Sequence, residues 1–250
     1  MIKLFRKIRK NLLLEGKTTQ YFKYAIGEII LVVIGILIAL QINNWNENRQ
    51  KKNFEIDYLT EIKGNLEKDT LNINDAIVFN EKKIDSIVST FKLFEVANNG
   101  EPYFDKFRLK VGVLTDHVLF EPVRTGFDNM VSSEKIGLIS NKDLRTYLSN
   151  YYSDYSYRNG TQERVKLLTR KFTDEILPII MSKEMILSFF GMELNLKSTS
   201  QIAIHTNEKV AANLFLMLQT HSVLINELKE RKIVIKNIIH QIDKELNTIQ

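Results

Sequence analysis

Histidine and cysteine, the side chains that most often carry chemistry, are scarce in this chain. Cysteine is absent, which excludes thiolate nucleophiles, disulfides and thiolate metal sites. No histidine belongs to an H-E-x-x-H zinc motif, and none has a glutamate three residues before it, as di-iron helical bundles require. Neither a G-x-S-x-G nucleophile elbow nor a phosphate-binding glycine loop is present. We therefore expect no catalytic residue, no metal site and no cofactor, and we do not expect an enzyme. The four histidines are His117, His205, His221 and His240.

The tyrosines are more informative, because five of the nine lie between Tyr147 and Tyr157. Tyr147, Tyr151 and Tyr155 recur at a spacing of four, which places them on one face of a helix. Such a face can stack on a sugar or a peptide. Alternatively, the tyrosines line a hydrated seam between helices, which we favour because tyrosine combines an apolar body with a polar tip.

His221 is the fourth member of this candidate interaction face, because it falls on an apolar helical stripe. Two interpretations are open. The favoured one is a core or interface histidine with its hydrogen bonds satisfied. The other is a ligand or a pH-dependent switch, since the pKa of histidine lies near neutrality.

The elements that must position these residues are helices. One apolar stripe, in which Asn80 is the only polar member, indicates a long helix that ends at about Ala97, before Asn98-Asn99-Gly100. Residues 98–140 are expected to connect the long helices through short helices and turns. No stretch of comparable length alternates like a strand, so the fold class is all-α, a bundle of long helices. The stripe consists of Ile73, Ile77, Asn80, Ile84, Ile87, Phe91 and Phe94.

Two further long helices are expected. Ser140 is the predicted N-cap of a helix that reaches Leu177, just before Pro178. The last helix begins at about Asn207, and its stripe from Leu214 to Ile249 has the narrow spacing of a coiled-coil seam. That seam could face a second copy of the chain, which would make a homo-oligomer, or it could lie wholly inside one bundle.

A membrane anchor is expected before the bundle. No charged residue occurs from Ile29 to Asn46, and Tyr24 and Trp45 bracket the apolar run. Their 22 residues would make about 33 Å of helix, enough to cross a bilayer. A cleaved signal peptide is the alternative, but no A-x-A-like cleavage site follows the run. We therefore expect a segment at 1–23, a transmembrane helix at 24–45 and a helical bundle at 46–250.

The net charge of +5 lies entirely in residues 1–28, which hold seven basic and two acidic side chains, whereas the remainder is neutral. This position favours a membrane-surface or topogenic role and argues against nucleic-acid binding. By the positive-inside rule, the N-terminus lies in the cytoplasm and the bundle on the other side of the membrane. The basic residues that could lie on the anionic inner leaflet include Lys3, Arg6, Lys7, Arg9 and Lys10.

Three residues within the span invite specific interpretations. Glu28 either extends to the headgroup region, which we favour, or pairs with another subunit. Gly35 and Ala39 form a small-x-x-x-small pair that would allow two helices to approach closely.

The opening of the chain closely resembles an uncharacterised family of Gram-negative bacterial membrane proteins known as domain of unknown function 6090. The resemblance is carried by Met1-Ile2-Lys3-Leu4-Phe5-Arg6-Lys7-Ile8-Arg9, by Tyr24-Ala25-Ile26-Gly27-Glu28-Ile29, and by the run from Val33 to Glu47. It implies a single-pass protein of the inner (cytoplasmic) membrane, and with the orientation expected from the basic residues the main domain would be periplasmic. Because the family has no established activity, no catalytic or binding residue is carried over.

Two functions remain. The first is a membrane-tethered structural or interaction module of the bacterial cell envelope, whose partners would be the lipid bilayer and either another copy or an envelope protein. The second is a sensor-like periplasmic domain that binds a small ligand between its helices. The short segment before the span favours the first.

Overall fold

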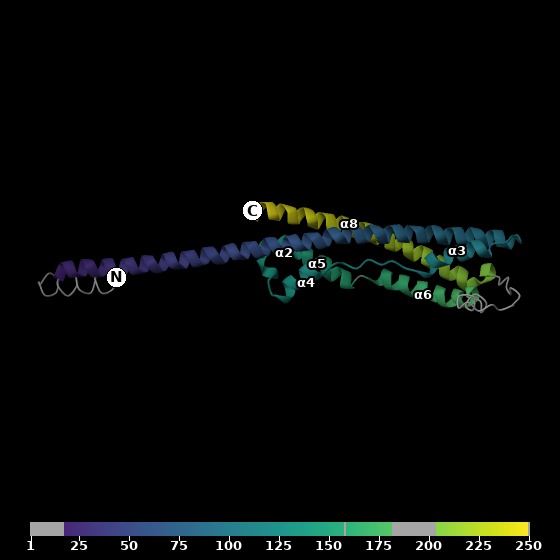
Figure 1. Cartoon of the computed structure of the whole chain (residues 1–250), viewed down its shortest axis with the longest axis horizontal. Helices are drawn as coiled ribbons and strands as arrows, with labels where there is room; N and C mark the ends of the chain where they lie inside the picture. Colours follow the sequence, from purple (N-terminus) through teal and green to yellow (C-terminus); the bar gives the residue numbers. More distant parts are fainter. Residues whose placement is uncertain (1–17, 158, 182–203, 250) are drawn as a thin grey trace, which may run out of the picture. The chain divides into compact units, whose positions relative to one another are not determined.

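The computed structural model describes residues 18–157, 159–181 and 204–249, and this part of the chain is helical without any β-strand, which confirms the all-α fold class (Figure 1). The α-helices are α2 (Thr18–Asn98), α3 (Phe104–Thr115), α4 (Thr125–Ser132), α5 (Lys142–Tyr157), α6 (Gly160–Ile180) and α8 (Glu208–Ile249). Two short 3₁₀ helices, η1 (Ile136–Leu138) and η2 (Ile204–Thr206), lie before α5 and α8.

The chain divides into two units, residues 1–57 and residues 58–250. In the first unit, α2 contains an 18-residue window with a mean hydropathy of 2.6, none of which is buried. By length and composition this part of α2 could cross a membrane. A soluble core helix of similar composition would be expected to bury its apolar side chains.

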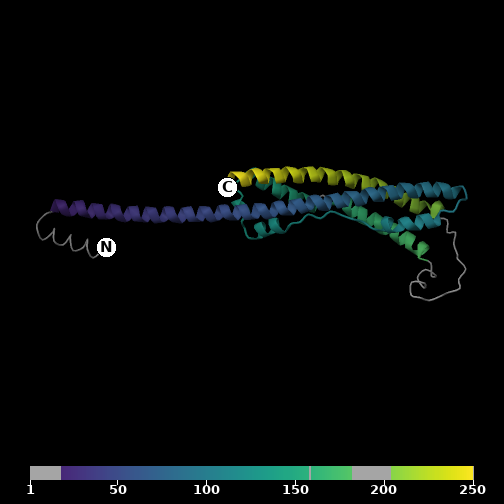
Figure 2. The same cartoon turned by 45° about the horizontal axis from the view of Figure 1, so that its top comes forward.

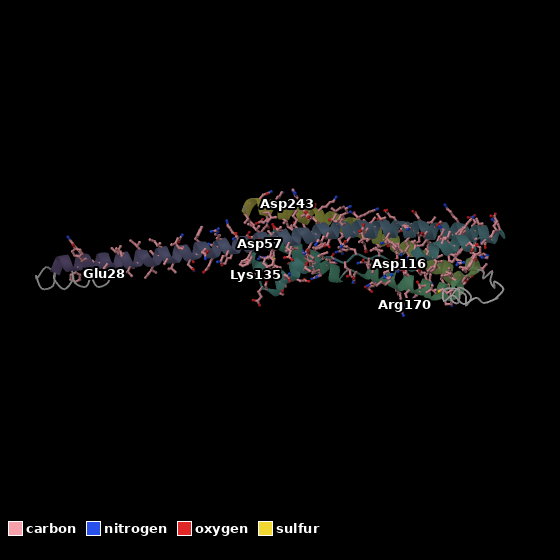
Figure 3. All side chains as sticks on the ribbon, viewed as in Figure 1. Glu28, Asp57, Asp116, Lys135, Arg170 and Asp243 are labelled. Atoms are coloured by element: carbon pink, nitrogen blue, oxygen red, sulfur yellow. The ribbon has the colours of Figure 1, made fainter. Side chains whose placement is uncertain are left out.

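In the second unit, α2 and α8 run antiparallel, as both views show (Figures 1 and 2). Two side-chain contacts establish the pairing: Lys63 Nζ lies 2.6 Å from Asp243 Oδ1, and Lys232 Nζ lies 2.6 Å from Asn74 Oδ1. Residue numbers therefore rise along α2 as they fall along α8. Asp243 marks the end of α8 near the C-terminus (Figure 3).

The other helices complete the bundle around this pair. α6 packs antiparallel on α8, since Thr161 donates to Glu227 (2.8 Å) at one end and Asn213 donates to Glu175 (3.2 Å) at the other. α5 contacts the last part of α8, where Asn141 donates to Glu245 (2.8 Å). α3 packs on α6.

The apolar core consists of two clusters at successive levels of the bundle. The first includes Leu66 and Ile73 of α2 together with Ile235 of α8, and the second includes Ile87, Phe172 and Leu214. Complete burial of one such aliphatic side chain is worth about 1.5–3 kcal/mol. The stripe of α8 thus lies inside this unit, which supports the interpretation within one bundle over a seam that faces a second chain.

The helix ends follow local rules, with one correction. At the end of α2, Gly100 has φ 84°, Glu101 N–H donates to Val96 C=O and Gly100 N–H donates to Ala97 C=O, the pattern of a Schellman motif. The predicted end near Ala97 is therefore confirmed. The N-cap of α5 is Asn141, whose Oδ1 accepts from the backbone N–H groups at 143 and 144, and not Ser140 as predicted. Ser140 donates instead to Glu245.

The helix predicted from Ser140 to Leu177 is also corrected, because it is two helices. α5 ends at Tyr157 and α6 begins at Gly160, after Asn159. Asparagine and glycine both favour turns over helix interiors, which accounts for the break. At the other end, α6 continues through Pro178 to Ile180. Proline removes only its own hydrogen bond, and one lost bond is tolerated so close to a helix end.

Candidate functional site

A groove between α5 and α8 lies beside the predicted tyrosine face. Its volume is about 760 Å³, within the range of ligand pockets. Tyr147 is 54% exposed at its rim, whereas Tyr151 is only 4% exposed and lies deep in it. The lining residues are Tyr147, Asn150, Tyr151, Ser153 and Asp154 of α5, and Glu227, Glu230, Arg231, Val234 and Ile238 of α8.

Tyr151 connects this groove to α2 through a buried carboxylate. Its hydroxyl donates to Asp69 Oδ2 (2.8 Å), and the backbone N–H of Val123 donates to Asp69 Oδ1 (2.7 Å). Asp69 is completely buried. Both carboxylate oxygens therefore have a donor, which a buried carboxylate requires.

The pKa values of this pair move as burial dictates. Burial raises the pKa of Asp69, although the hydrogen bonds from Val123 and Tyr151 and the charge of Arg231 act in the opposite direction. Burial, reinforced by the nearby Asp69 charge, raises the pKa of the Tyr151 hydroxyl. Tyr151 consequently stays protonated and keeps its role as donor.

Tyr152, on the next position of α5, fills the space behind this pair. It is completely buried, and its ring stacks on that of Phe127 with the centroids 4.4 Å apart. Arg124 donates to the backbone carbonyl of Tyr152 (2.8 Å), and its guanidinium also pairs with Asp128. The tyrosine-rich segment thus forms a packed seam in which Tyr147 alone of these three rings is largely exposed.

A second polar group lies between the two apolar clusters. The Nζ of Lys83 is completely enclosed, where it donates to the backbone carbonyl of Asp116 and to Thr169 Oγ1 (3.2 Å). Asp116 itself lies in the segment that follows α3 (Figure 3). Burial lowers the pKa of Lys83 to about 7, although the Asp116 charge raises it.

His221 belongs to this layer. Its Nδ1 is hydrogen-bonded to Asn80 Oδ1, and Asn80 Nδ2 donates to the backbone carbonyls of Ala76 (2.6 Å) and Val118 (3.2 Å). The His221 Nε2 is buried and has no hydrogen-bond partner among the described residues. Burial, followed by the charges of Lys83 and His117, lowers the pKa of His221 to about 3, so the ring is neutral near pH 7.

The structure therefore separates residues that we had grouped together. Tyr147 and Tyr151 lie in the groove, but His221 does not belong to an interaction face, because its ring is completely enclosed in the core. The stripe on which His221 lies faces the bundle, and a neutral, hydrogen-bonded histidine is compatible with that position. The backbone of Tyr155 belongs to α5, but its side chain lies outside the described residues.

The residues of the predicted anchor belong to the other unit. Tyr24, Ala39 and Trp45 are exposed, and the Arg49 guanidinium lies 5.7 Å from the Trp45 ring centroid. A Cβ at Gly35 would meet no atom within 4 Å. Glu28 is half-buried and takes part in an interaction. The basic residues Lys3, Arg6, Lys7, Arg9 and Lys10 lie outside the described residues.

Sequence reasoning missed Asp69, Lys83 and Arg231. A signal for the first two exists, because both lie at core-facing positions of α2, in step with Leu66, Ile73 and Ile87. Charged residues at such positions indicate a buried polar contact. Arg231 is the only arginine of α8, but its spacing gives no sign that it acts on a buried carboxylate.

The side chains of the groove are suited to hydrogen bonds and charge interactions with a ligand. In the described ranges, no cluster of three or more histidine, cysteine, aspartate or glutamate side chains is arranged to hold a metal ion. What the groove provides is an exposed aromatic ring, several hydrogen-bonding groups and an excess of carboxylates over guanidinium groups.

Removing the Tyr151 hydroxyl tests the connection to α2. Tyr151→Phe is expected to lower the free energy of unfolding by about 1.5–3 kcal/mol, because one oxygen of a buried carboxylate loses its donor. Urea denaturation of the purified chain in detergent, followed by circular dichroism, measures the change. Tyr147→Phe, four residues away on the same helix and exposed, is the matched control and should change it by less than about 0.5 kcal/mol. Equal effects of the two variants would contradict the assignment.

Fold and groove together define an all-α bundle that shares one helix with an apolar segment able to span a membrane. The chain belongs to the family of unknown function DUF6090, whose model matches residues 28–202. The match extends well beyond the apolar run, whereas the resemblance in the sequence was carried chiefly by the first fifth of the chain. No curated protein and no solved structure matches the chain.

Proposed function

We propose that the protein is a membrane-tethered, non-catalytic interaction module of the bacterial cell envelope. The observation that carries the proposal is the composition of α2. Its residues from Ile29 to Trp45 are exposed and uncharged, and its later part, from Leu59 to Ala97, supplies core residues of the bundle. An anchor that is also a core helix joins the bundle to the membrane without a separate linker.

In the proposed topology, the N-terminus lies in the cytoplasm, the apolar segment crosses the inner membrane and the bundle is periplasmic. The excess of basic residues before the apolar run supports this orientation. The proposed partners are the lipid bilayer and an envelope protein. Self-association is proposed only through the apolar segment, at Gly35 and Ala39, since the α8 stripe is occupied within its own bundle.

Reporter fusions test this topology. A reporter enzyme that is active only outside the cytoplasm, fused after Gln250, is expected to be active, whereas a reporter active only in the cytoplasm should be inactive at the same site. Replacing Lys3, Arg6, Lys7, Arg9 and Lys10 by glutamine should reduce the share of correctly oriented chains, because the charge bias is weakened. The reverse pattern of reporter activity would overturn the proposed orientation.

The groove favours a second candidate, a sensor-like domain. A small ligand between α5 and α8 would contact Tyr151, which is hydrogen-bonded to Asp69 of α2. Because α2 also carries the apolar segment, ligand binding would act directly on the anchoring helix.

A further inference from the structure

We propose that the α5–α8 groove is the surface through which the module binds its partner, and that it fits a polypeptide segment in which a lysine or arginine side chain lies close to an aliphatic or aromatic one. This inference rests on the proposed interaction function and specifies the chemistry of the partner. It is carried by the limits of the groove, by its charge and by its apolar end.

Two hydrogen bonds to α8, one from the N-cap of α5 and one from α6, mark the two limits of the groove. At one limit Asn141 donates to Glu245, and at the other Thr161 donates to Glu227. Between them, α5 lines the groove from Tyr147 to Asp154. Seven helical steps cover about 10 Å, which corresponds to about three residues of extended polypeptide. The groove therefore accommodates a short segment rather than a whole helix.

The charge of the groove is negative. Three carboxylates line it, those of Asp154, Glu227 and Glu230, against one guanidinium, that of Arg231. The guanidinium carbon of Arg231 lies 6.0 Å from the Phe120 ring centroid, and its charge acts on the buried Asp69. The Arg231 guanidinium thus interacts with groups of the core as well as with the groove. An excess of carboxylates along a groove attracts an ammonium or guanidinium group.

The opposite end of the groove is apolar. Tyr147 and Ile238 lie toward the Asn141–Glu245 limit, whereas Asp154 and Glu227 lie toward the Thr161–Glu227 limit, as the antiparallel contacts require. Val234 is 47% exposed, and with Tyr147 it presents apolar area to solvent. An aromatic or aliphatic side chain would cover this area, and the Tyr147 ring can also face a cation.

The combination of a negatively charged end and an apolar end favours a polypeptide segment over a free organic amine. A simple polyamine would match the negative charge of the groove but leave Tyr147 and Val234 exposed. A segment with a basic and an apolar side chain two residues apart would match both ends at once, because alternate side chains of an extended strand lie on the same side, about 7 Å apart.

The test uses the full chain in detergent and blocked tripeptides as probes. The first probe contains arginine and tryptophan separated by glycine. In one comparison peptide the neutral isostere citrulline replaces arginine, and in another alanine replaces tryptophan. Spermine represents a free amine. Isothermal titration is expected to show binding of the arginine–tryptophan peptide, weakened about tenfold or more by either replacement.

Protein variants complete the test. Glu230→Gln should weaken binding about three- to tenfold, Glu230→Lys more strongly, and Tyr147→Ala about three- to tenfold. Asp85→Asn, an exposed carboxylate of α2 that does not line the groove, is the control and should leave binding unchanged. All three substituted side chains are exposed, so the fold should persist, which circular dichroism verifies.

Two results would overturn the inference. One is no binding of the arginine–tryptophan peptide at millimolar concentration, or binding that Glu230→Lys does not affect. The other is spermine binding at least as tightly, with no effect of Tyr147→Ala, which would make the occupant a free organic cation. Either result leaves the proposed function standing if the reporter fusions place the bundle outside the cytoplasm, so the two failures are distinguishable.

Discussion

Ile235→Asp is expected to lower the free energy of unfolding of the bundle by about 4 kcal/mol or more. Ile235 lies in the first apolar cluster and is 0% exposed. An aspartate there either leaves an unpaired charge in the core or takes up a proton at an energetic cost. Single domains are stable by only about 5–15 kcal/mol, so the variant loses a large share of the total stability.

Ile233→Asp is the matched control, because it makes the same change two residues away on α8 at a side chain that is 61% exposed. It should alter the free energy of unfolding by less than about 0.5 kcal/mol. Thermal denaturation of both variants is followed by circular dichroism in detergent, at a protein concentration on the order of micromolar. It shows whether the core substitution destabilises the bundle and the surface substitution does not. Equal stabilities would show that this face of α8 is not core.

The stability of the bundle is expected to rise between pH 7 and pH 9.5. Because burial lowers the pKa of Lys83 from 10.5 to about 7, the unfolded chain holds one more proton than the folded chain over this range. Each pH unit then adds up to about 1.4 kcal/mol to the free energy of unfolding. The pH range of the test ends below pH 10, because burial raises the pKa values of Tyr151 and Tyr152. Above pH 10 these tyrosines would ionise in the unfolded chain but not in the folded chain, which would lower the free energy of unfolding.

His221 extends the same trend to acid pH. Its pKa falls from 6.5 to about 3 on folding, so protonation of the unfolded chain should reduce stability below about pH 6.5. The charge of Asp116, in the segment after α3, acts on Lys83, and the charges of Lys83 and His117 act on His221. Among these, the Asp116 carboxylate is the one that favours a charged lysine.

Urea midpoints at pH 7.0 and pH 9.5 measure this dependence. Lys83→Met should flatten the profile, because the titrating group is removed and a side chain of similar length remains. Lys82→Met, an exposed neighbour, is the control and should keep the slope. A profile that is already flat in the unmodified chain would mean that Lys83 remains charged in the folded protein.

Periodicity predicted the elements well because it reports which side of a helix is buried. The end of α2 near Ala97 and the start of α8 near Asn207 both agree with the structure, and Asn207 caps α8 through its side chain. The break between Tyr157 and Gly160 was missed because apolar residues continue at helical spacing on both sides of it.

The candidate site was less predictable. The spacing of Tyr147 and Tyr151 placed them on one face, but it could not show that one ring is exposed while the other donates to Asp69 of a distant helix. That difference depends on how deeply each position lies between α5 and α8. Likewise, lysine is a residue type that usually lies on the surface, whereas Lys83 is enclosed by the tertiary arrangement of the helices.

The polar layer around Asn80 and His221 also determines how α2 and α8 align along their common axis. Aliphatic side chains pack almost equally well if one helix slides past the other by a turn, about 5.4 Å, whereas a hydrogen bond between two single positions does not survive such a shift. After a shift of one turn, Asn80 and His221 would no longer meet. The Asn80–His221 hydrogen bond therefore favours one axial alignment of α2 and α8 over an alignment shifted by a turn.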